Sequence, residues 1–340
     1  MPLSLFRRRA ASPGVPRSPT EPPRAIDGAR PHARAEPTAE EAVAPRTDRS
    51  ALLRKIRKIE IVTERLVRDR MAGQYHSVFK GSGISFSEVR QYMPGDDIRL
   101  IDWNVSARMN DAYIKLFTEE REMTVLLLVD MSASGRFGSA GQEKRELAAE
   151  IAAVVAFSAI RNNDRVGLVV FTDRVEKFVP PKKGKKHVLR VVSEILSFEP
   201  RHRGTRIAAS LEFLGHVARR RAVAFLVSDF LAPLASYERA LRVISRRHDI
   251  IPVTVTDPLE EALPSVGLVE LEDPESGELV LFDTSGPEAR AAERDARKAL
   301  EARQALFRRL DMDGISVRTD RPYLRALSAF FEARARRLRH

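Results

Sequence analysis

The sequence of 340 residues contains no cysteine. This absence excludes disulfide bonds, thiolate metal sites and cysteine nucleophiles, and it is typical of a reducing compartment such as the cytoplasm. No stretch approaches the roughly 18 to 20 consecutive apolar residues that a membrane-spanning helix needs. The first ten residues have too short an apolar part for a secretory signal, and their arginines stand on the wrong side of it. We therefore expect a soluble, cytoplasmic protein without a membrane span.

The motifs of several common enzyme classes are also missing. The chain has no Walker A loop, no GxGxxG loop and no GxSxG elbow, so NTPase, dinucleotide-binding and serine-hydrolase functions lack their usual anchors. The histidines show no paired metal-ligand spacing, and without cysteine a zinc site is not expected. The net charge of +11 is compatible with nucleic-acid binding. However, the basic residues are scattered and no recognition motif accompanies them, so we expect no specific nucleic-acid partner.

Composition and periodicity divide the chain into four segments. Residues 1–48 hold nine prolines and almost no large apolar side chains, so they cannot bury enough surface to fold and are predicted to be disordered. Residues 49–122 contain an amphipathic helix followed by a strand-rich segment. Residues 123–258 alternate strand and helix. Residues 259–340 hold a hairpin, a long helix, a strand and a closing helix, which are expected to complete the same domain.

The alternation over residues 123–258 predicts an α/β fold. Two of its strands, 125–129 and 222–227, are short runs of Val, Leu, Phe and Ala, which is typical of parallel strands that are buried on both faces. Helices between such strands form βαβ crossovers and cover both sides of the sheet. We expect a doubly wound, mostly parallel sheet, preceded by a small strand-rich N-terminal segment.

Polar residues stand where two of these strands end. Asp130, Ser132 and Ser134 follow the first buried strand in VLLLVDMSAS, Thr205 precedes a predicted helix, and Asp229 closes a second apolar strand. Ligands bind at the carboxyl edge of an open parallel sheet. A carboxylate with small hydroxyls suits a hard cation that takes oxygen ligands. The five residues therefore predict a divalent-cation site at one edge of the sheet.

In order and placement, these five residues resemble the metal-ion-dependent adhesion site of von Willebrand factor A domains. The resemblance covers about residues 123–256 and implies a von Willebrand factor A-like fold. It implies that the hydroxyls of Ser132, Ser134 and Thr205 bind Mg²⁺, or alternatively Mn²⁺ or Ca²⁺, directly or nearly so. The two aspartates would act largely through water, and an acidic side chain of a partner would fill the last coordination position.

A second resemblance lies just before the sheet, in GSGISFSEVRQYMPGDDIRLIDWNVSAR at residues 81–108. This segment is similar to the signature of the bacterial domain-of-unknown-function family 58. The signature residues are Arg90, Tyr92, Gly95, Asp96, Arg99, Asp102, Trp103 and Arg108. The resemblance implies a von Willebrand factor A-like domain that works beside a MoxR-type AAA+ ATPase. Many relatives carry two N-terminal membrane helices, so this chain resembles the short, soluble form.

The charged residues of this signature allow two interpretations. Together with Trp103, the only tryptophan, they could form a catalytic cluster. We favour a buried ion-pair network, in which arginine forks bind carboxylates and Trp103 anchors the segment to the sheet domain. The Pro94-Gly95-Asp96 run is also good turn chemistry. The segment could equally form part of a partner surface.

One function is favoured and two alternatives remain open. The favoured function is a non-enzymatic interaction module that docks an acidic group of a partner through a divalent cation, with a MoxR-type ATPase, in the assembly or maturation of protein complexes. The first alternative is a metal-dependent phosphoryl-transfer or hydrolytic enzyme. However, Ser132 stands where an aspartyl phosphatase has its acid, and a serine cannot take that role. The second alternative is a metal-free scaffold in which the hydroxyls only satisfy loop amides. The sequence does not indicate the oligomeric state.

Overall fold

The computed structural model describes residues 49–66, 75, 78–79, 85–118, 122–273 and 277–337. The predicted disorder of residues 1–48 lies outside these residues. None of the described helices is both long and apolar enough to cross a membrane.

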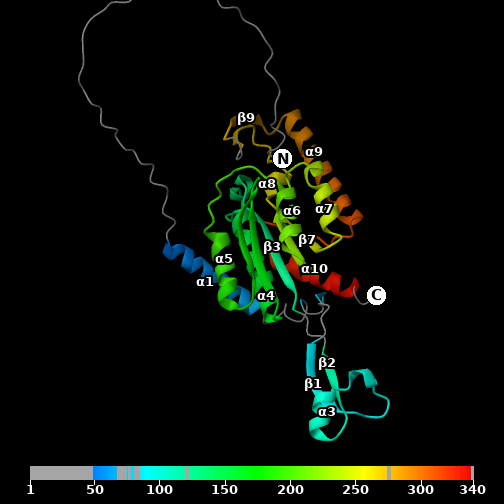
Figure 1. Cartoon of the computed structure of the whole chain (residues 1–340). Coiled ribbons are helices and arrows are strands. Elements are labelled where there is room, and N and C mark those ends of the chain that lie inside the picture. The colour runs from blue at the N-terminus through cyan, green and yellow to red at the C-terminus, as the bar shows by residue number, and fades with distance from the viewer. Residues whose placement is uncertain are drawn as a thin grey trace, which may run out of the picture.

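The helices and strands follow one another in the order shown in Figure 1. They are α1 (Arg49–Leu66), β1 (Ser85–Gln91), η3 (Ile98–Leu100), α3 (Trp103–Met109), β2 (Tyr113–Thr118), β3 (Thr124–Asp130), η4 (Ala133–Arg136), α4 (Lys144–Arg161), β4 (Arg165–Phe171), β5 (Val175–Lys182), α5 (Lys185–Leu196), α6 (Ile207–Val217), β6 (Val223–Ser228), η5 (Leu234–Ser236), α7 (Glu238–Ile244), β7 (Asp249–Thr256), α8 (Pro258–Glu261), β8 (Leu268–Glu272), β9 (Leu279–Asp283), α9 (Pro287–Arg309), β10 (Ile315–Arg318) and α10 (Tyr323–Arg337).

A six-stranded sheet forms the centre of the protein, in the order β10-β7-β6-β3-β4-β5. Neighbouring strands are parallel except at one edge, where β5 runs antiparallel to β4. From the central strand β3 the chain first adds β4 and β5 on one side, and then adds β6, β7 and β10 on the other. The sheet is therefore doubly wound, which confirms the predicted α/β fold class. The order reverses between β3 and β6, and such a switch point opens a crevice at the carboxyl ends of the strands.

Helices cover both faces of the sheet. On one face, α1, α4, α5 and α10 share an apolar cluster with Val125, Leu127 and Val129. On the other face, α6, α7 and α9 pack with Leu126 and Leu128. Side chains of a strand alternate between the two faces, so a strand covered on both sides requires an uninterrupted apolar run. The LLLV run of β3 meets this requirement and holds Asp130 rigidly at its end.

The last third of the chain both extends the sheet and adds a hairpin. Strand β10 pairs in parallel with β7 at the edge of the sheet. Strands β8 and β9 form a separate antiparallel pair, which lies beyond the carboxyl ends of the central strands (Figure 1). The hairpin therefore lies at the same end of the protein as the predicted metal site.

Residues 85–118, which include the described part of the signature segment, form a lobe made of β1, η3, α3 and β2. The lobe projects from the opposite end of the sheet (Figure 1). Arg90 donates two hydrogen bonds to the Asp96 carboxylate, at 2.8 and 2.7 Å. Asp97 caps η3 and Asp102 caps α3. The predicted arginine fork is therefore present, together with carboxylates that hold the short helices.

The prediction that this ion-pair network is buried and that Trp103 anchors the segment to the sheet domain was wrong. The side chains of Arg90 and Asp96 are 38% and 19% exposed, and Trp103 is 72% exposed. The lobe projects away from the sheet, so Trp103 has no apolar surface of the sheet to pack against. Gly95 has a φ of 107°, a value that other residues rarely adopt, which supports the predicted turn.

Candidate metal site

The predicted site residues meet at the switch point of the sheet. Asp130 is the last residue of β3, and Ser132 and Ser134 follow it at the start of η4. Asp229 directly follows β6, the strand that pairs with β3. Because β3 and β6 are parallel neighbours, their ends bring these four residues to one edge although the two aspartates are far apart in the sequence.

Hydrogen bonds fix the geometry of this cluster. Asp130 accepts a bond from the Ser132 amide at 3.0 Å and another from the Ser228 hydroxyl at 2.7 Å. The hydroxyl oxygens of Ser132 and Ser134 are 3.1 Å apart, and the Asp229 carboxylate accepts a hydrogen bond from the Leu231 amide at 3.2 Å. All of these side chains are buried. Two carboxylates and two hydroxyls are thus held in place together.

A cavity of about 20 Å³ lies among these groups and is bounded by Asp130, Ser132, Ser134 and Asp229, with Lys144 at its side. A space of roughly 10–15 Å³ is enough for one water molecule, so the cavity accommodates a single ion. Thr205 does not line it. The structure therefore brings four of the five predicted residues to the cavity and leaves the fifth outside.

The loop that carries Thr205 nevertheless belongs to the same edge of the sheet. The Ala133 amide donates to the Arg203 carbonyl at 3.0 Å, and the Arg206 amide donates to the Thr172 carbonyl at 2.8 Å. Within the described part of the chain, no hydrogen bond of the Thr205 hydroxyl is found. This hydroxyl lies outside the cavity, on a loop that is tied to the Asp130 loop through its backbone.

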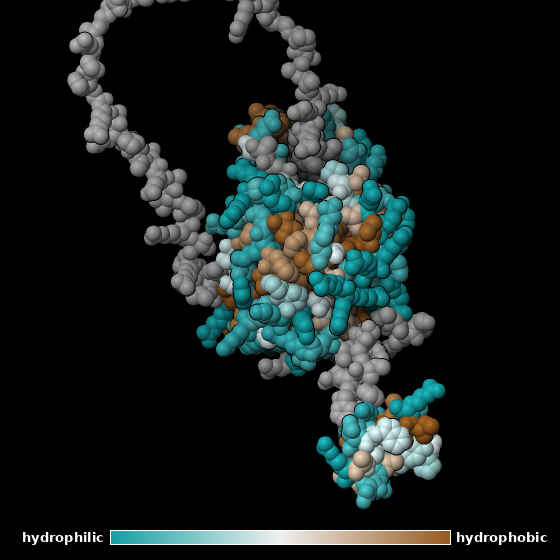
Figure 2. Space-filling model, in the orientation of Figure 1, coloured by the Kyte–Doolittle hydropathy of each residue, from teal (hydrophilic) through white to brown (hydrophobic). Residues whose placement is uncertain are grey.

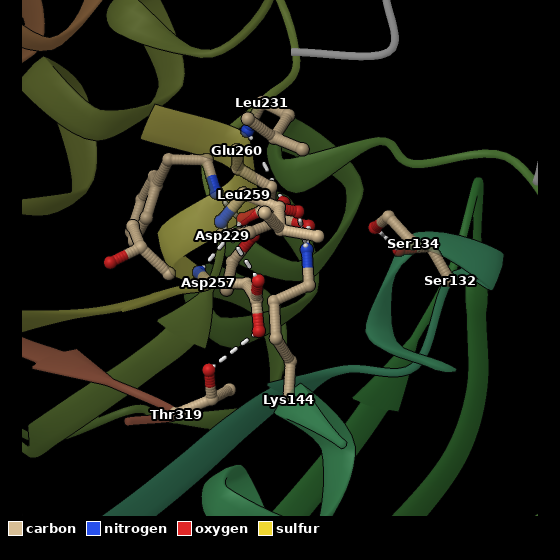
Figure 3. Close-up of polar contacts among 12 residues, drawn as sticks. Ser132, Ser134, Lys144, Asp229, Leu231, Asp257, Leu259, Glu260 and Thr319 are labelled. Carbon is tan, nitrogen blue, oxygen red and sulfur yellow. Dashed lines mark hydrogen bonds and ion pairs between the residues drawn. The ribbon is translucent and has the colours of Figure 1, made fainter. Parts of the chain in front are cut away.

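A buried lysine, which the sequence analysis missed, completes the site. Lys144 is the first residue of α4, and its ammonium group donates to Asp229 at 2.7 Å and also to Glu260. Figure 3 shows the Lys144 side chain reaching from its helix toward both carboxylates. Glu260 comes from the short helix α8, where it forms a capping box with Asp257. The local sequence Asp257-Pro258-Leu259-Glu260 is a recognisable signal for the start of a helix. This signal could have predicted that Glu260 lies in the first turn of α8.

Burial and charge together perturb the ionisation of these groups. Burial and the nearby charge of Asp229 raise the pKa of Asp130 to about 6. Burial would also raise the pKa of Asp229, but the Lys144 charge and the hydrogen bonds to the carboxylate together outweigh burial and hold the pKa below its ordinary value. Burial keeps the pKa of Glu260 above its ordinary value despite the same lysine. Lys144 pairs with Asp229 and Glu260, so a cation beside Asp130 would relieve the repulsion between the Asp130 and Asp229 carboxylates.

The donor set fits an oxygen-ligated divalent cation. Among the described residues, no group of three or more His, Asp or Glu side chains could hold a metal by itself. A metal in the cavity would be held by hydroxyl oxygens together with the two aspartates, and such oxygen donors suit Mg²⁺, Mn²⁺ or Ca²⁺. The residues therefore match such an ion in chemistry, and the cavity matches it in size.

The fold and the site define a doubly wound α/β protein with an oxygen-rich cluster at its switch point. Residues 88–303 match the family described as "Protein of unknown function DUF58", and the chain belongs to this family. A relative in Mycobacterium tuberculosis (strain ATCC 25618 / H37Rv), "Uncharacterized protein Rv1480", is 33% identical over 296 residues, which are 85% of this chain and 92% of the relative. The family match begins within β1 and includes the rest of the lobe and the candidate site.

Solved structures resemble the protein only distantly. The BatB protein from Bacteroides thetaiotaomicron covers 63% of this chain and 99% of its own, with 16% identity and a TM-score of 0.39. A von Willebrand factor type A structure from Catenulispora acidiphila covers 63% of this chain and 42% of its own, with 14% identity and a TM-score of 0.34. Both TM-scores lie below 0.5. The doubly wound α/β fold class therefore follows from the strand order of the sheet.

Proposed function

We propose that the protein is a non-enzymatic interaction module that docks an acidic group of a partner protein through a divalent cation at the switch point. The observation that carries this proposal is the convergence of Asp130, Ser132, Ser134 and Asp229 on one ion-sized cavity. The resemblance to a metal-ion-dependent adhesion site supports the same residues. Thr205 would join them through a small movement of its loop when the partner binds.

The buried lysine supports a docking role for the ion. Lys144 already neutralises much of the charge on Asp229, and the hydroxyl ligands carry no charge. An ion in this cavity would therefore keep much of its positive charge, and would attract a carboxylate from outside the protein. Mg²⁺ is the expected ion, with Mn²⁺ and Ca²⁺ as alternatives.

We propose a MoxR-type AAA+ ATPase, or a protein delivered to it, as the partner. This choice rests on the resemblance of residues 81–108 to the signature of family 58, which implies a domain that works beside such an ATPase. The module would then act in the assembly or maturation of protein complexes, and the acidic side chain of the partner would supply the last ligand of the ion.

Calorimetric titration of the full chain with MgCl₂ and MnCl₂ tests the metal site. We expect saturable binding that Asp130→Ala and Ser132→Ala abolish. Ser236→Ala is a matched control, since this exposed serine lies in η5 and its hydroxyl donates to the Pro233 carbonyl. The absence of binding in the unmodified protein would favour the metal-free scaffold.

A pull-down with a MoxR-type AAA+ ATPase tests the docking step. We expect capture in Mg²⁺, loss of capture in EDTA, and loss with Asp130→Ala. If capture is the same in EDTA and with Asp130→Ala, docking does not depend on the cation, and the interaction is independent of metal. Turnover of phosphoesters that requires Mg²⁺ and Asp130 would instead establish the enzymatic alternative.

A further inference from the structure

The outer face of the β8–β9 hairpin exposes three large apolar side chains. Leu268, Leu279 and Leu281 are 73%, 60% and 74% exposed. Brown, apolar atoms gather at this end of the protein in Figure 2, at the position of β9 in Figure 1. Isolated exposed leucines are common on proteins, but three on one small sheet face form a patch.

The hairpin does not need these leucines for its own packing. Its inner face already has a core, in which Phe282 packs with Ala292 of α9, and Val269 and Leu271 pack beside them. Since side chains alternate along each strand, the leucines on the outer face point away from this core. Among the described residues, no layer therefore covers the outer face of the hairpin.

Carboxylates alternate with the leucines on the outer face. In the observed register, Leu268 lies opposite Asp283, Leu281 lies opposite Glu270, and Leu279 lies opposite Glu272. Each cross-strand pair thus combines one apolar and one acidic side chain, in a checkerboard. No ion pair of these three carboxylates occurs within the described residues. Glu270 and Glu272 border a cavity that Arg136 and Arg203 also line, but all three carboxylates remain exposed, so the face presents negative charge together with its apolar surface.

The whole segment around the hairpin is acidic in an otherwise basic chain. Residues 257–288 contain ten Asp and Glu residues and no Lys or Arg, whereas the full chain has a net charge of +11. An occupant of this face must therefore bring positive charge as well as apolar side chains. A second copy of the same face would place carboxylates against carboxylates, which opposes self-association.

We propose that the outer face of β8–β9 binds a basic amphipathic helix of a partner protein. Five-residue strands give a face about 16 Å long, which matches roughly three turns of helix. Apolar side chains on one stripe of the helix cover Leu268, Leu279 and Leu281, and flanking Lys or Arg side chains reach the three carboxylates. Helix on sheet is also the layer arrangement that the rest of this protein uses. This binding requires no metal ion, so it is independent of the proposed site at Asp130.

The absence of cysteine makes a direct test available. The full-length Leu279→Cys variant carries a single thiol, which is labelled with an environment-sensitive fluorophore. The probe ligand is a synthetic three-turn Leu/Lys amphipathic peptide, and a peptide of the same composition in scrambled order is its control. Val243→Cys, at an exposed position on α7 (58% exposed), is the matched labelling control.

We expect a saturable blue shift of the Leu279→Cys label with the amphipathic peptide, unchanged by EDTA. Glu270→Lys combined with Glu272→Lys should weaken binding roughly tenfold or more, because like charges then face each other. Equal responses to the scrambled peptide, or an equal shift at Val243→Cys, would refute the proposal. A blue-shifted label before peptide is added would also refute it. In that case, a blue shift that grows with protein concentration would identify a second copy of the chain as the occupant of the hairpin face. A blue shift that is independent of protein concentration would identify another segment of the same chain.

Discussion

The ammonium group of Lys144 lies 2.7 Å from the Asp229 carboxylate, and the two side chains are 3% and 5% exposed. The same ammonium group also pairs with Glu260. A fixed positive charge is thus built into the edge of the sheet where a cation is proposed to bind. The lysine holds Asp229 in place when no metal is bound, and it limits the charge that Asp229 offers to a metal.

Replacing this lysine should therefore have opposite effects on stability and on metal binding. Lys144→Met leaves two buried carboxylates without a counter-charge, so we expect a loss of about 3–5 kcal/mol in the free energy of unfolding. Mg²⁺ should bind this variant more tightly and restore part of the lost stability. Denaturant unfolding with and without MgCl₂ measures both effects.

Lys177→Met is the control for this experiment. Lys177 pairs with Glu194 on the surface, and such pairs contribute no more than about 1 kcal/mol. If Lys144→Met and Lys177→Met unfold at the same denaturant concentration, the buried ion pairs of Lys144 contribute no more to the free energy of unfolding than the surface pair of Lys177 does.

Ser228 is expected to act as a positioning residue for Asp130. Its hydroxyl donates to Asp130 at 2.7 Å and accepts from the Phe230 amide at 3.0 Å. Hydrogen bonds to charged groups contribute about 1.5–3 kcal/mol, so Ser228→Ala should weaken Mg²⁺ binding by roughly tenfold or more.

The buried Ser210 gives the matched control, because its hydroxyl donates to the Ile207 carbonyl within α6, away from the candidate site. Ser210→Ala should change stability without changing Mg²⁺ affinity in calorimetry. Unchanged affinity in Ser228→Ala would show that the hydrogen bond does not orient Asp130 for a metal.

Much of the fold and part of the site could be predicted from the sequence, for a physical reason. A strand buried on both faces needs an apolar run, and the residue after the run must then lie at the sheet edge. This rule placed Asp130 and Asp229 beside each other. Lys144 and Glu260 could not be paired in the same way, since they are 116 residues apart and their contact depends on how α4 and α8 pack.

The orientation of the lobe relative to the sheet could likewise not be predicted from sequence patterns. The turn at Pro94-Gly95-Asp96 and the fork of Arg90 follow from local chemistry, and both occur. The exposure of Trp103 depends instead on where the whole lobe lies relative to the sheet. The local sequence around an aromatic residue in a charged segment does not indicate whether its side chain packs against the sheet or faces solvent.

The fork of Arg90 should stabilise the turn of the lobe without affecting the sheet. The Met93 amide donates to the Asp96 carboxylate at 2.8 Å, and the Asp96 amide donates to the Met93 carbonyl at 3.0 Å. Arg90→Lys keeps the charge but loses the two-pronged geometry. We expect faster hydrogen exchange at the Met93 and Asp96 amides, with unchanged protection in β3 and β6.

Arg174→Lys serves as the comparison, because Arg174 also forms a two-pronged pair with an aspartate, Asp173, at the surface of the sheet domain. It should leave exchange in the lobe unchanged. Unaltered exchange at Met93 and Asp96 in Arg90→Lys would show that the turn is held by its backbone alone.

Asp257 should make the protein sensitive to acid. Burial alone would raise the pKa of Asp257, but hydrogen bonds from the hydroxyls of Ser139 and Thr319 and from backbone amides outweigh burial and hold the pKa below its ordinary value. A carboxyl group with a lowered pKa in the folded state stabilises that state above the unfolded pKa of roughly 4. This stabilisation is lost as the pH falls through the folded pKa.

Asp257→Asn removes the charge but keeps the size of the side chain. At neutral pH we expect a loss of about 1.5–3 kcal/mol in the free energy of unfolding, because charged acceptors form the stronger hydrogen bonds. The difference from the unmodified protein should shrink as the pH falls below about 4. Asp111→Asn, at an exposed position in the lobe, controls for the change in net charge. The difference in the free energy of unfolding could instead stay constant from neutral to acid pH. That result would show that the charge of Asp257 does not strengthen its hydrogen bonds with Ser139 and Thr319.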